Sequence, residues 1–223
     1  MPPPLPAAVY LCWIPLGADG DCVRLNGRVF EAVAATMSHR ARCDLYHSAL
    51  VVELGGEHYT IELAPSPDGD ESSRGVVASG AVGSRHAGRL RMFRYEVRCW
   101  RDGSIPDLAA AVGPPSWLSS DPRVARRLLD VVATIPTPVW GRDELRAGEM
   151  WNSNSATAWL LAAGGLPTAH LHPPPHGRAP GWNAGLAVAR RTRSPAATRR
   201  TPPRKELTRC PPRSSSRSRT PQH

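Results

Sequence analysis

The sequence predicts an α+β domain in which an antiparallel sheet packs against a few helices, followed by a disordered basic tail. Two apolar runs rich in β-branched and aromatic residues flank the Gly55-Gly56 pair, as in a β-hairpin with a two-residue turn. Two later segments, residues 122–135 and 153–163, carry apolar residues at helical spacing. From residue 190 onward almost no apolar residue remains, so this part cannot form a core.

The basic character of the chain lies in its C-terminal part. The 223 residues include 28 Lys and Arg and 19 Asp and Glu, which gives a net charge of +9. Residues 190–223 hold 11 of the basic and one of the acidic residues, which leaves 17 basic and 18 acidic residues in 1–189. We therefore predict a neutral domain, 1–189, and a tail, 190–223. Arginines of the tail can contact nucleic-acid phosphates, but the tail has no aromatic residue to stack on bases, which favours a tail without specific binding.

Composition excludes several classes of protein. No apolar run approaches the roughly 20 residues of a membrane span, and the first residues lack the charged start of a secretion signal, so we expect a cytoplasmic protein. The five cysteines show no CxxC spacing and their number is odd, which supports neither a zinc site nor a disulfide framework. His170, His172 and His176 are interrupted by prolines and have no acidic neighbour, which favours a surface loop over a metal site. We expect no cofactor.

The first half of the domain is predicted to hold a strand, a helix and the hairpin. Residues 7–15 form a short apolar run before a turn, which is typical of a buried strand. Residues 23–37 place Val29, Val33 and Met37 on one side and are interpreted as a helix.

The hairpin turn fixes which residues share a face. With the two glycines at the turn, Leu50 opposes Ile61 on a largely apolar face. His47 and Glu62 then share the second face as diagonal neighbours. A carboxylate beside an imidazole can fix its tautomer and stabilise its charged form. The alternative is an exposed ion pair with no catalytic role.

The middle of the chain is predicted to be a long connection and a strand. Residues 65–84 are rich in Ser, Gly, Asp and Pro, with 75–79 as a short strand within them. Residues 90–100 alternate, and we expect an inward face of Phe93, Tyr95, Val97 and Cys99. The opposite face carries three charges and is expected to be solvated.

Both later helices have clear start signals. Asp121-Pro122 pairs a capping acid with Pro at the first helical position. Residues 152–155, Asn-Ser-Asn-Ser, lead into an apolar helix that stops at Gly164-Gly165. A hydroxyl at Ser153 or Ser155 would lie at a helix N-terminus, where developing negative charge is favoured. This suits a nucleophile, although helix capping accounts for the same residues and is the favoured reading of this stretch alone. Residues after 165 are Pro- and His-rich, and no element is predicted there.

Two motifs of the chain resemble the circularly permuted papain-like superfamily. Tyr46-His47, with the strand and turn that follow, looks like the superfamily's aromatic-His hairpin, and Trp151-Asn152-Ser153-Asn154-Ser155 looks like its Asn-Cys-Asn-Ser helix start. The order, hairpin first and helix much later, is also similar. The superfamily includes PPPDE-type deubiquitinating and deSUMOylating peptidases, lecithin retinol acyltransferase-like enzymes and permuted relatives of NlpC-type cell-wall peptidases. The resemblance implies a permuted papain-like fold and hydrolysis or transfer at an amide or ester of a protein or a small acyl substrate.

The resemblance implies roles for four residues, with one departure from the pattern. Ser153 occupies the position of the nucleophilic Cys, and a serine hydroxyl needs a base to take its proton during attack. His47 would be that base and Glu62 would orient it. Amides of the first helical turn, with the Asn152 side chain, would hold the oxyanion.

Two further hypotheses compete with this enzyme hypothesis. The first is a catalytically silent papain-like scaffold that serves as a binding or structural domain, with Ser153 as a cap only. The second is a nucleic-acid-binding protein that acts through residues 190–223. Of the three hypotheses, the silent scaffold is the favoured reading. The nucleic-acid hypothesis explains the charge but neither the hairpin nor the helix start.

Overall fold

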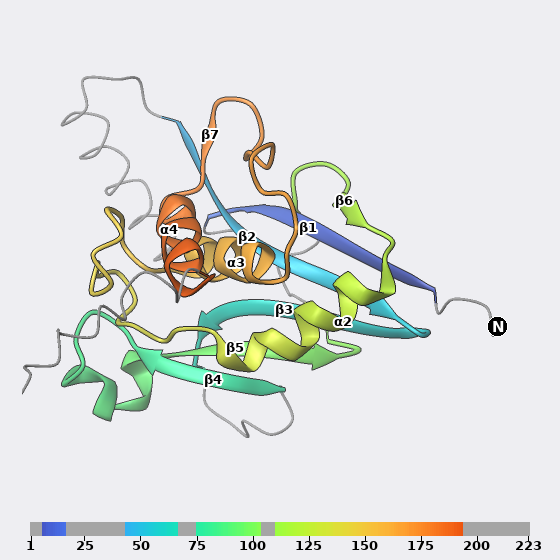
Figure 1. Ribbon diagram of the computed structural model, residues 1–223. Coiled ribbons are helices and arrows are strands. Elements are labelled where there is room, and N and C mark those ends of the chain that lie inside the picture. Colours follow the sequence, from blue (N-terminus) through green and yellow to red (C-terminus); the bar gives the residue numbers. More distant parts are fainter. Residues whose placement is uncertain (1–5, 17–42, 67–74, 104–109, 194–223) are drawn as a thin grey trace, which may run out of the picture. The chain divides into compact units, whose positions relative to one another are not determined.

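The computed structural model describes residues 6–16, 43–66, 75–103 and 110–193, which belong to one compact unit. These residues form an α+β fold, as the sequence predicts, with a seven-stranded sheet and three α-helices (Figure 1). The strands are β1 (Ala7–Pro15), β2 (Asp44–Leu54), β3 (Glu57–Pro65), β4 (Val76–Ala81), β5 (Arg94–Arg101), β6 (Ser116–Ser119) and β7 (Gly177–Arg178). The helices are α2 (Pro122–Val131), α3 (Ser153–Ala163) and α4 (Trp182–Arg193).

The sheet is antiparallel except for one short contact. Its order is β4-β5-β3-β2-β1-β6, and β7 pairs with β2 in parallel through Asp44 and Leu45. The predicted strands at 7–15 and 75–79 correspond to β1 and β4. The strands β6 and β7 were not predicted, because they comprise four and two residues and have no alternating pattern of their own.

The predicted hairpin and its register are confirmed. Leu50 pairs with Ile61, and the ladder continues to Leu54 opposite Glu57. Gly55 and Gly56 have φ angles of 65° and 86°, the left-handed conformation that both central residues of a type I′ turn require. Glycine adopts it without the steric penalty that a Cβ would bring.

Strand β2 is buried on both of its faces. Its even-numbered residues from Tyr46 to Leu54 face the main core, except that Ser48 takes a polar position there. Ala49 and Val51 face the opposite side, where they pack with Cys12 and Ile14 of β1. Since side chains alternate along a strand, β2 separates two apolar clusters.

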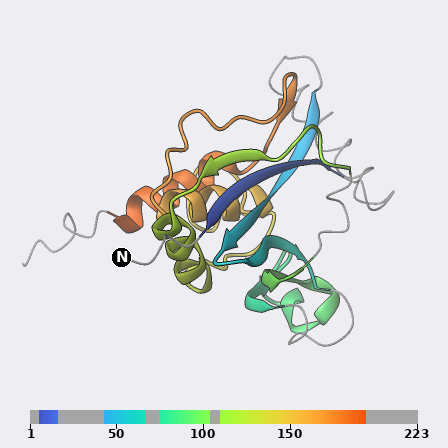
Figure 2. The ribbon, with the colours of Figure 1, turned by 90° about the vertical axis from the view of Figure 1, so that its right-hand side faces the viewer.

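The helices cover the main core. The N-terminal half of α3 packs against β2, and α4 packs against α3 (Figures 1 and 2). Helix α2 begins as predicted, with Asp121 accepting from the amide of Arg123 at 2.8 Å and Pro122 in the first turn. It ends earlier than predicted, because residues Val132–Thr134 form a 3-10 turn.

Helix α4 corrects the prediction for the end of the domain. The sequence was assigned no element after 165 and a tail from 190, yet α4 continues to Arg193. Trp182, Leu186 and Ala189 have the spacing of one helical face, and all three lie in or against the core. The pattern was hidden because Gly185 breaks the apolar run and arginines follow it.

Strand β5 also differs from its prediction. It begins at Arg94, because residues 87–93 form the 3-10 turns η2 (Ala87–Arg89) and η3 (Arg91–Phe93). Tyr95 and Val97 face the core as predicted, whereas Phe93 is 40% exposed. The face expected to be solvated is in fact buried at Glu96 and Arg98, which are 1% and 6% exposed.

Some predictions fall outside the described residues, among them the helix at 23–37 and most of the tail. Within the described part of the chain, no helix is long and apolar enough to cross a membrane. The same residues contain no cluster of three side chains suited to hold a metal ion.

Candidate functional site at the junction of β2 and α3

The site begins with a stretch of β2, residues 46–49, that has no neighbouring strand on one of its two edges. The carbonyl of Leu45 accepts from Leu16 after β1 at 2.8 Å, so the carbonyls of Tyr46 and Ser48 point to the other edge. On that edge the ladder to β3 stops at Leu50, and β7 covers only Asp44 and Leu45. The carbonyls of Tyr46 and Ser48 therefore need partners from elsewhere in the chain.

Side chains of α3 supply these partners. Asn154 Nδ2 donates to the carbonyl of Tyr46 at 2.9 Å, and Thr157 Oγ1 donates to the carbonyl of Ser48 at 3.1 Å. Ser48 Oγ donates to Asn154 Oδ1 at 2.9 Å. Asn154, Thr157 and Ser48 are 2%, 6% and 1% exposed, so these bonds replace strand pairing in the interior. We call this group, with Asn152 and Ser155, the junction.

The first turn of α3 is closed by a capping box. Asn152 accepts from the amide of Ser155 at 3.2 Å, and the Ser155 hydroxyl accepts from the amide of Asn152 at 3.2 Å. Ser155 Oγ also donates to the carbonyl of Gly181 at 2.8 Å. The predicted helix start is thus confirmed, and its cap is tied to the segment that leads into α4.

Helix α4 and the residue before it approach the junction closely at two glycines. A Cβ on Gly181, whose φ is +85°, would lie 2.5 Å from Asn152 Oδ1 and 2.6 Å from Ser155 Oγ. A Cβ on Gly185 would lie 2.1 Å from the carbonyl oxygen of Ser155. Both positions require glycine, because backbone and buried polar atoms occupy the space.

The structure brings the two motifs of the sequence together. Ser48 and Tyr46, the neighbours of His47, both bind Asn154, the neighbour of Ser153. The Ser153 side chain is 6% exposed, and its hydroxyl makes no hydrogen bond among the described residues. His47 is half-buried and shares its strand face with Ala49 and Val51, whereas Tyr46 and Ser48 face α3.

Glu62 lies on the same face of the hairpin as His47, but β5 supplies its described partner. Arg98 Nη1 donates to Glu62 Oε1 at 3.1 Å, and Arg98 Nε donates to Glu96 Oε2 at 3.0 Å. All three side chains are buried, with an exposed fraction below one tenth. Arg98 also donates to the carbonyl of Pro65 at 3.1 Å and stacks on the Trp100 ring. Sequence reasoning missed this cluster because the opposite face of β5 was expected to be in water.

Asn152 is occupied in a similar way. Its Nδ2 donates to the carbonyl of Pro180 at 2.8 Å, while its Oδ1 caps the helix. The backbone amides of Ser153 and Asn154 make no hydrogen bond among the described residues. Two donors of the first turn therefore remain next to the Ser153 hydroxyl.

Two of the cysteines that the structure describes, Cys12 and Cys99, are poor candidates for a nucleophile. Cys12 lies on β1 and Cys99 on β5, and Cys43 immediately precedes β2. Burial raises the pKa of Cys12 and of Cys99 to about 11. Both are therefore almost entirely protonated at neutral pH, and a protonated thiol is a poor nucleophile.

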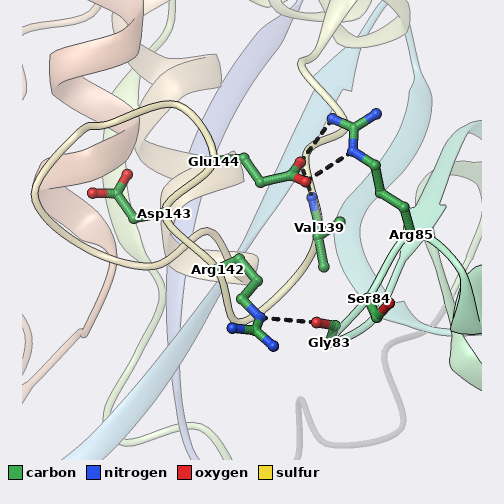
Figure 3. A pocket seen from close by; sticks show the side chains of 7 residues that line it. All are labelled: Gly83, Ser84, Arg85, Val139, Arg142, Asp143 and Glu144. Carbon is green, nitrogen blue, oxygen red and sulfur yellow. Dashed lines mark hydrogen bonds and ion pairs between the residues drawn. The ribbon is translucent and has the colours of Figure 1, made fainter.

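A cavity of about 390 Å³ lies away from the junction, between the turn after β4 and the segment before α3 (Figure 3). Arg85 donates to both carboxylate oxygens of Glu144, at 2.8 and 2.9 Å, and Arg142 donates to the carbonyl of Gly83. The hydrogen bond from Arg85 lowers the pKa of Glu144 below its ordinary value. The charged side chains of this cavity are thus used in bonds within the protein. We interpret them as anchors between the turn after β4 and the segment before α3.

Comparisons with protein-family models, with curated protein sequences and with solved structures found no match to this chain.

Proposed function

We propose that this chain is a catalytically silent binding or structural domain on a permuted papain-like scaffold. The observation that carries the proposal is the junction itself. The polar side chains around Ser153 hold α3 on the edge of β2, with Asn154 bridging Tyr46 and Ser48. On this proposal, the helix start serves to hold the fold together, and no acyl transfer takes place there.

The two predicted helpers of catalysis support the proposal. Glu62, expected to orient His47, binds Arg98 in a buried ion pair. Asn152, expected to stabilise an oxyanion, donates to the carbonyl of Pro180. A serine nucleophile needs an oriented base and donors aimed at the developing charge, and these two side chains are engaged in other bonds.

The second candidate is an amide or ester hydrolase, or acyltransferase, that uses Ser153 and His47. One observation favours it: the first-turn amides of Ser153 and Asn154 remain as donors next to the Ser153 hydroxyl. Asn154 also ties the strand that carries His47 to α3, but the His47 side chain lies on the opposite strand face from Tyr46 and Ser48. In such an enzyme His47 would take the proton of the Ser153 hydroxyl as that oxygen attacks the carbonyl carbon.

Labelling with a fluorophosphonate probe tests the choice between the candidates. On the proposal, the intact protein takes up no probe at Ser153, and the Ser153→Ala variant gives the same background. Labelling of Ser153 that is lost in His47→Ala would contradict the proposal and establish the hydrolase. Ser119→Ala, which changes a serine outside the junction, serves as the control for nonspecific reaction.

A second experiment tests the scaffold separately from the chemistry. Ser153→Cys restores the residue type of the superfamily at the helix start, where first-turn amides stabilise a thiolate. We expect iodoacetamide at pH 7 to alkylate the introduced thiol at least tenfold faster than Cys12 and Cys99, whose pKa values are about 11. His47→Ala in the same background should leave this rate unchanged, because His47 lies on the strand face opposite to the one that faces α3. An introduced thiol as slow as the two buried cysteines argues against a papain-like site.

A further inference from the structure

The loop between β4 and β5 carries three large apolar side chains, just before β5, that are not part of a hydrophobic core. Leu90, Met92 and Phe93 are 59%, 77% and 40% exposed. None of them belongs to either hydrophobic cluster of the described residues. Large apolar side chains gathered on one short segment point to a contact with an apolar phase or partner.

The backbone presents these side chains in a fixed way. The two 3-10 turns are closed by bonds from Leu90 to the carbonyl of Ala87 at 2.9 Å and from Phe93 to that of Leu90 at 3.0 Å. Both ends of the loop are anchored: Arg85 binds Glu144, as Figure 3 shows, and Arg94 donates to Ser79 at 2.8 Å. The segment is therefore an ordered protrusion from the sheet.

Basic residues alternate with the apolar ones. Arg89 and Arg91 flank Leu90 and are exposed. Residues 75–95 contain four arginines and neither Asp nor Glu. The tip, residues 89–93, thus combines exposed apolar side chains with positive charge, which is the combination that anionic lipid surfaces attract.

We propose that this tip binds the surface of a membrane that contains anionic phospholipids. Leu90, Met92 and Phe93 enter the boundary between headgroups and acyl chains, and Arg89 and Arg91 contact lipid phosphates. The attachment is peripheral and needs no spanning helix. It is independent of the function proposed for the junction, since none of the junction's hydrogen bonds described above involves residues 89–93.

A lipid surface suits the tip better than a protein partner. A stable protein interface takes about 20–30 residues from each side, whereas the exposed apolar tip comprises five residues. The three cavities at residues 83–85 with 139–144, at 122–130, and at 80–94 with 137–139 are not lined by Leu90, Met92 or Phe93. A fluid lipid phase accepts a small protrusion without a complementary pocket.

Vesicle sedimentation with the full chain tests the proposal. Vesicles of pure phosphatidylcholine and of phosphatidylcholine with 30% phosphatidylserine are compared in about 0.1 M and 0.5 M NaCl, since salt screens exposed charges. We expect binding to the anionic vesicles and at least a tenfold weaker partition for the triple variant Leu90→Ser, Met92→Ser, Phe93→Ser. Arg89→Gln with Arg91→Gln should weaken binding mainly at low salt.

The basic tail is present in every variant, so a difference between variants reports on the tip. Trp117→Ser removes another large exposed apolar side chain, 61% exposed, and should change the partition less than twofold. Circular dichroism checks that each variant is folded. Equal partition of the intact protein and the triple variant overturns the proposal, and so does an intact protein that binds neither vesicle. A dimer that the triple variant abolishes, without any change on vesicles, assigns the tip to protein contact and also overturns it.

Discussion

Asn154 is the residue on which the junction depends most directly. Its amide nitrogen donates to the carbonyls of Tyr46 and Pro180, at 2.9 and 3.0 Å, and its amide oxygen accepts from Ser48. One side chain thus joins β2, α3 and the segment before α4. A primary amide is suited to this task because it offers donors and an acceptor at once.

Asn154→Ala should lower the free energy of unfolding by about 2–3 kcal/mol, because it leaves buried carbonyls and the Ser48 hydroxyl without partners. Urea unfolding followed by tryptophan fluorescence measures the change. The control is Asn183→Ala, which removes an exposed amide bound to Glu149 and should cost about 0.5 kcal/mol or less. Equal losses in the two variants would show that the bridge is not needed for stability.

The start of α3 could be predicted from the sequence, but the role of Asn154 could not. The polar cluster at residues 152–155 predicts a capped helix, and both the start and the cap are found. The sequence does not indicate that Asn154, rather than a strand, binds the carbonyl of Tyr46. That role depends on where β3 leaves β2, which local periodicity does not encode.

Between elements, the approach of α4 to α3 is set by one glycine. Gly185 allows the backbone of α4 to touch the carbonyl of Ser155 and the amide of Trp159. Glycine inside a helix is normally unfavourable relative to alanine by about 1 kcal/mol. Its presence in α4 is therefore explained by packing against α3.

Gly185→Ala should destabilise the protein by about 2 kcal/mol or more, because the added methyl group forces the two helices apart. The sign of the stability change distinguishes two effects, since helix propensity alone predicts that Gly→Ala stabilises the protein by about 1 kcal/mol. Thermal unfolding followed by circular dichroism at 222 nm gives the measurement. Arg190→Ala, an exposed position on the same helix, should change stability by about 0.5 kcal/mol or less. A stabilised Gly185→Ala variant would refute the close approach.

Prediction of elements succeeded where a segment carries its own signal. The hairpin glycines, the Asp121-Pro122 start and the alternation around Tyr95 each have a local cause, and each is confirmed. Helix α4 was missed because its apolar face is short and interrupted at Gly185. The burial of Glu96 and Arg98 was missed because alternation shows which side chains share a face but not what covers it.

At the scale of the whole molecule, the second face of the sheet contains a buried ion cluster. Arg98 lies between Glu62 and Glu96 and binds both at 3.0–3.1 Å. Ser66 Oγ donates to Glu96 at 2.7 Å, which adds a bond from the end of β3. Buried charges are tolerated only when partners compensate for their lost hydration.

Arg98→Met should reduce the free energy of unfolding by about 3–5 kcal/mol, since it leaves two buried carboxylates without their shared cation. The matched control is Arg101→Met on the same strand. Arg101 is 62% exposed where it pairs with Glu57, so its loss should cost about 1 kcal/mol or less. Chemical denaturation at neutral pH compares the two. Similar costs would mean that the cluster is solvated in solution.

The open edge of β2 has a consequence for how the chain is made. Residues 46–48 are translated about a hundred positions before Asn154 and Thr157, which complete their hydrogen bonding. On the ribosome, two carbonyls of the newly synthesised hairpin therefore have only water as a hydrogen-bond partner until the C-terminal helices emerge. A chain interrupted before α3 would expose an unpaired edge of β2 at residues 46–48. Such an edge is a target for chaperones and for aberrant self-association.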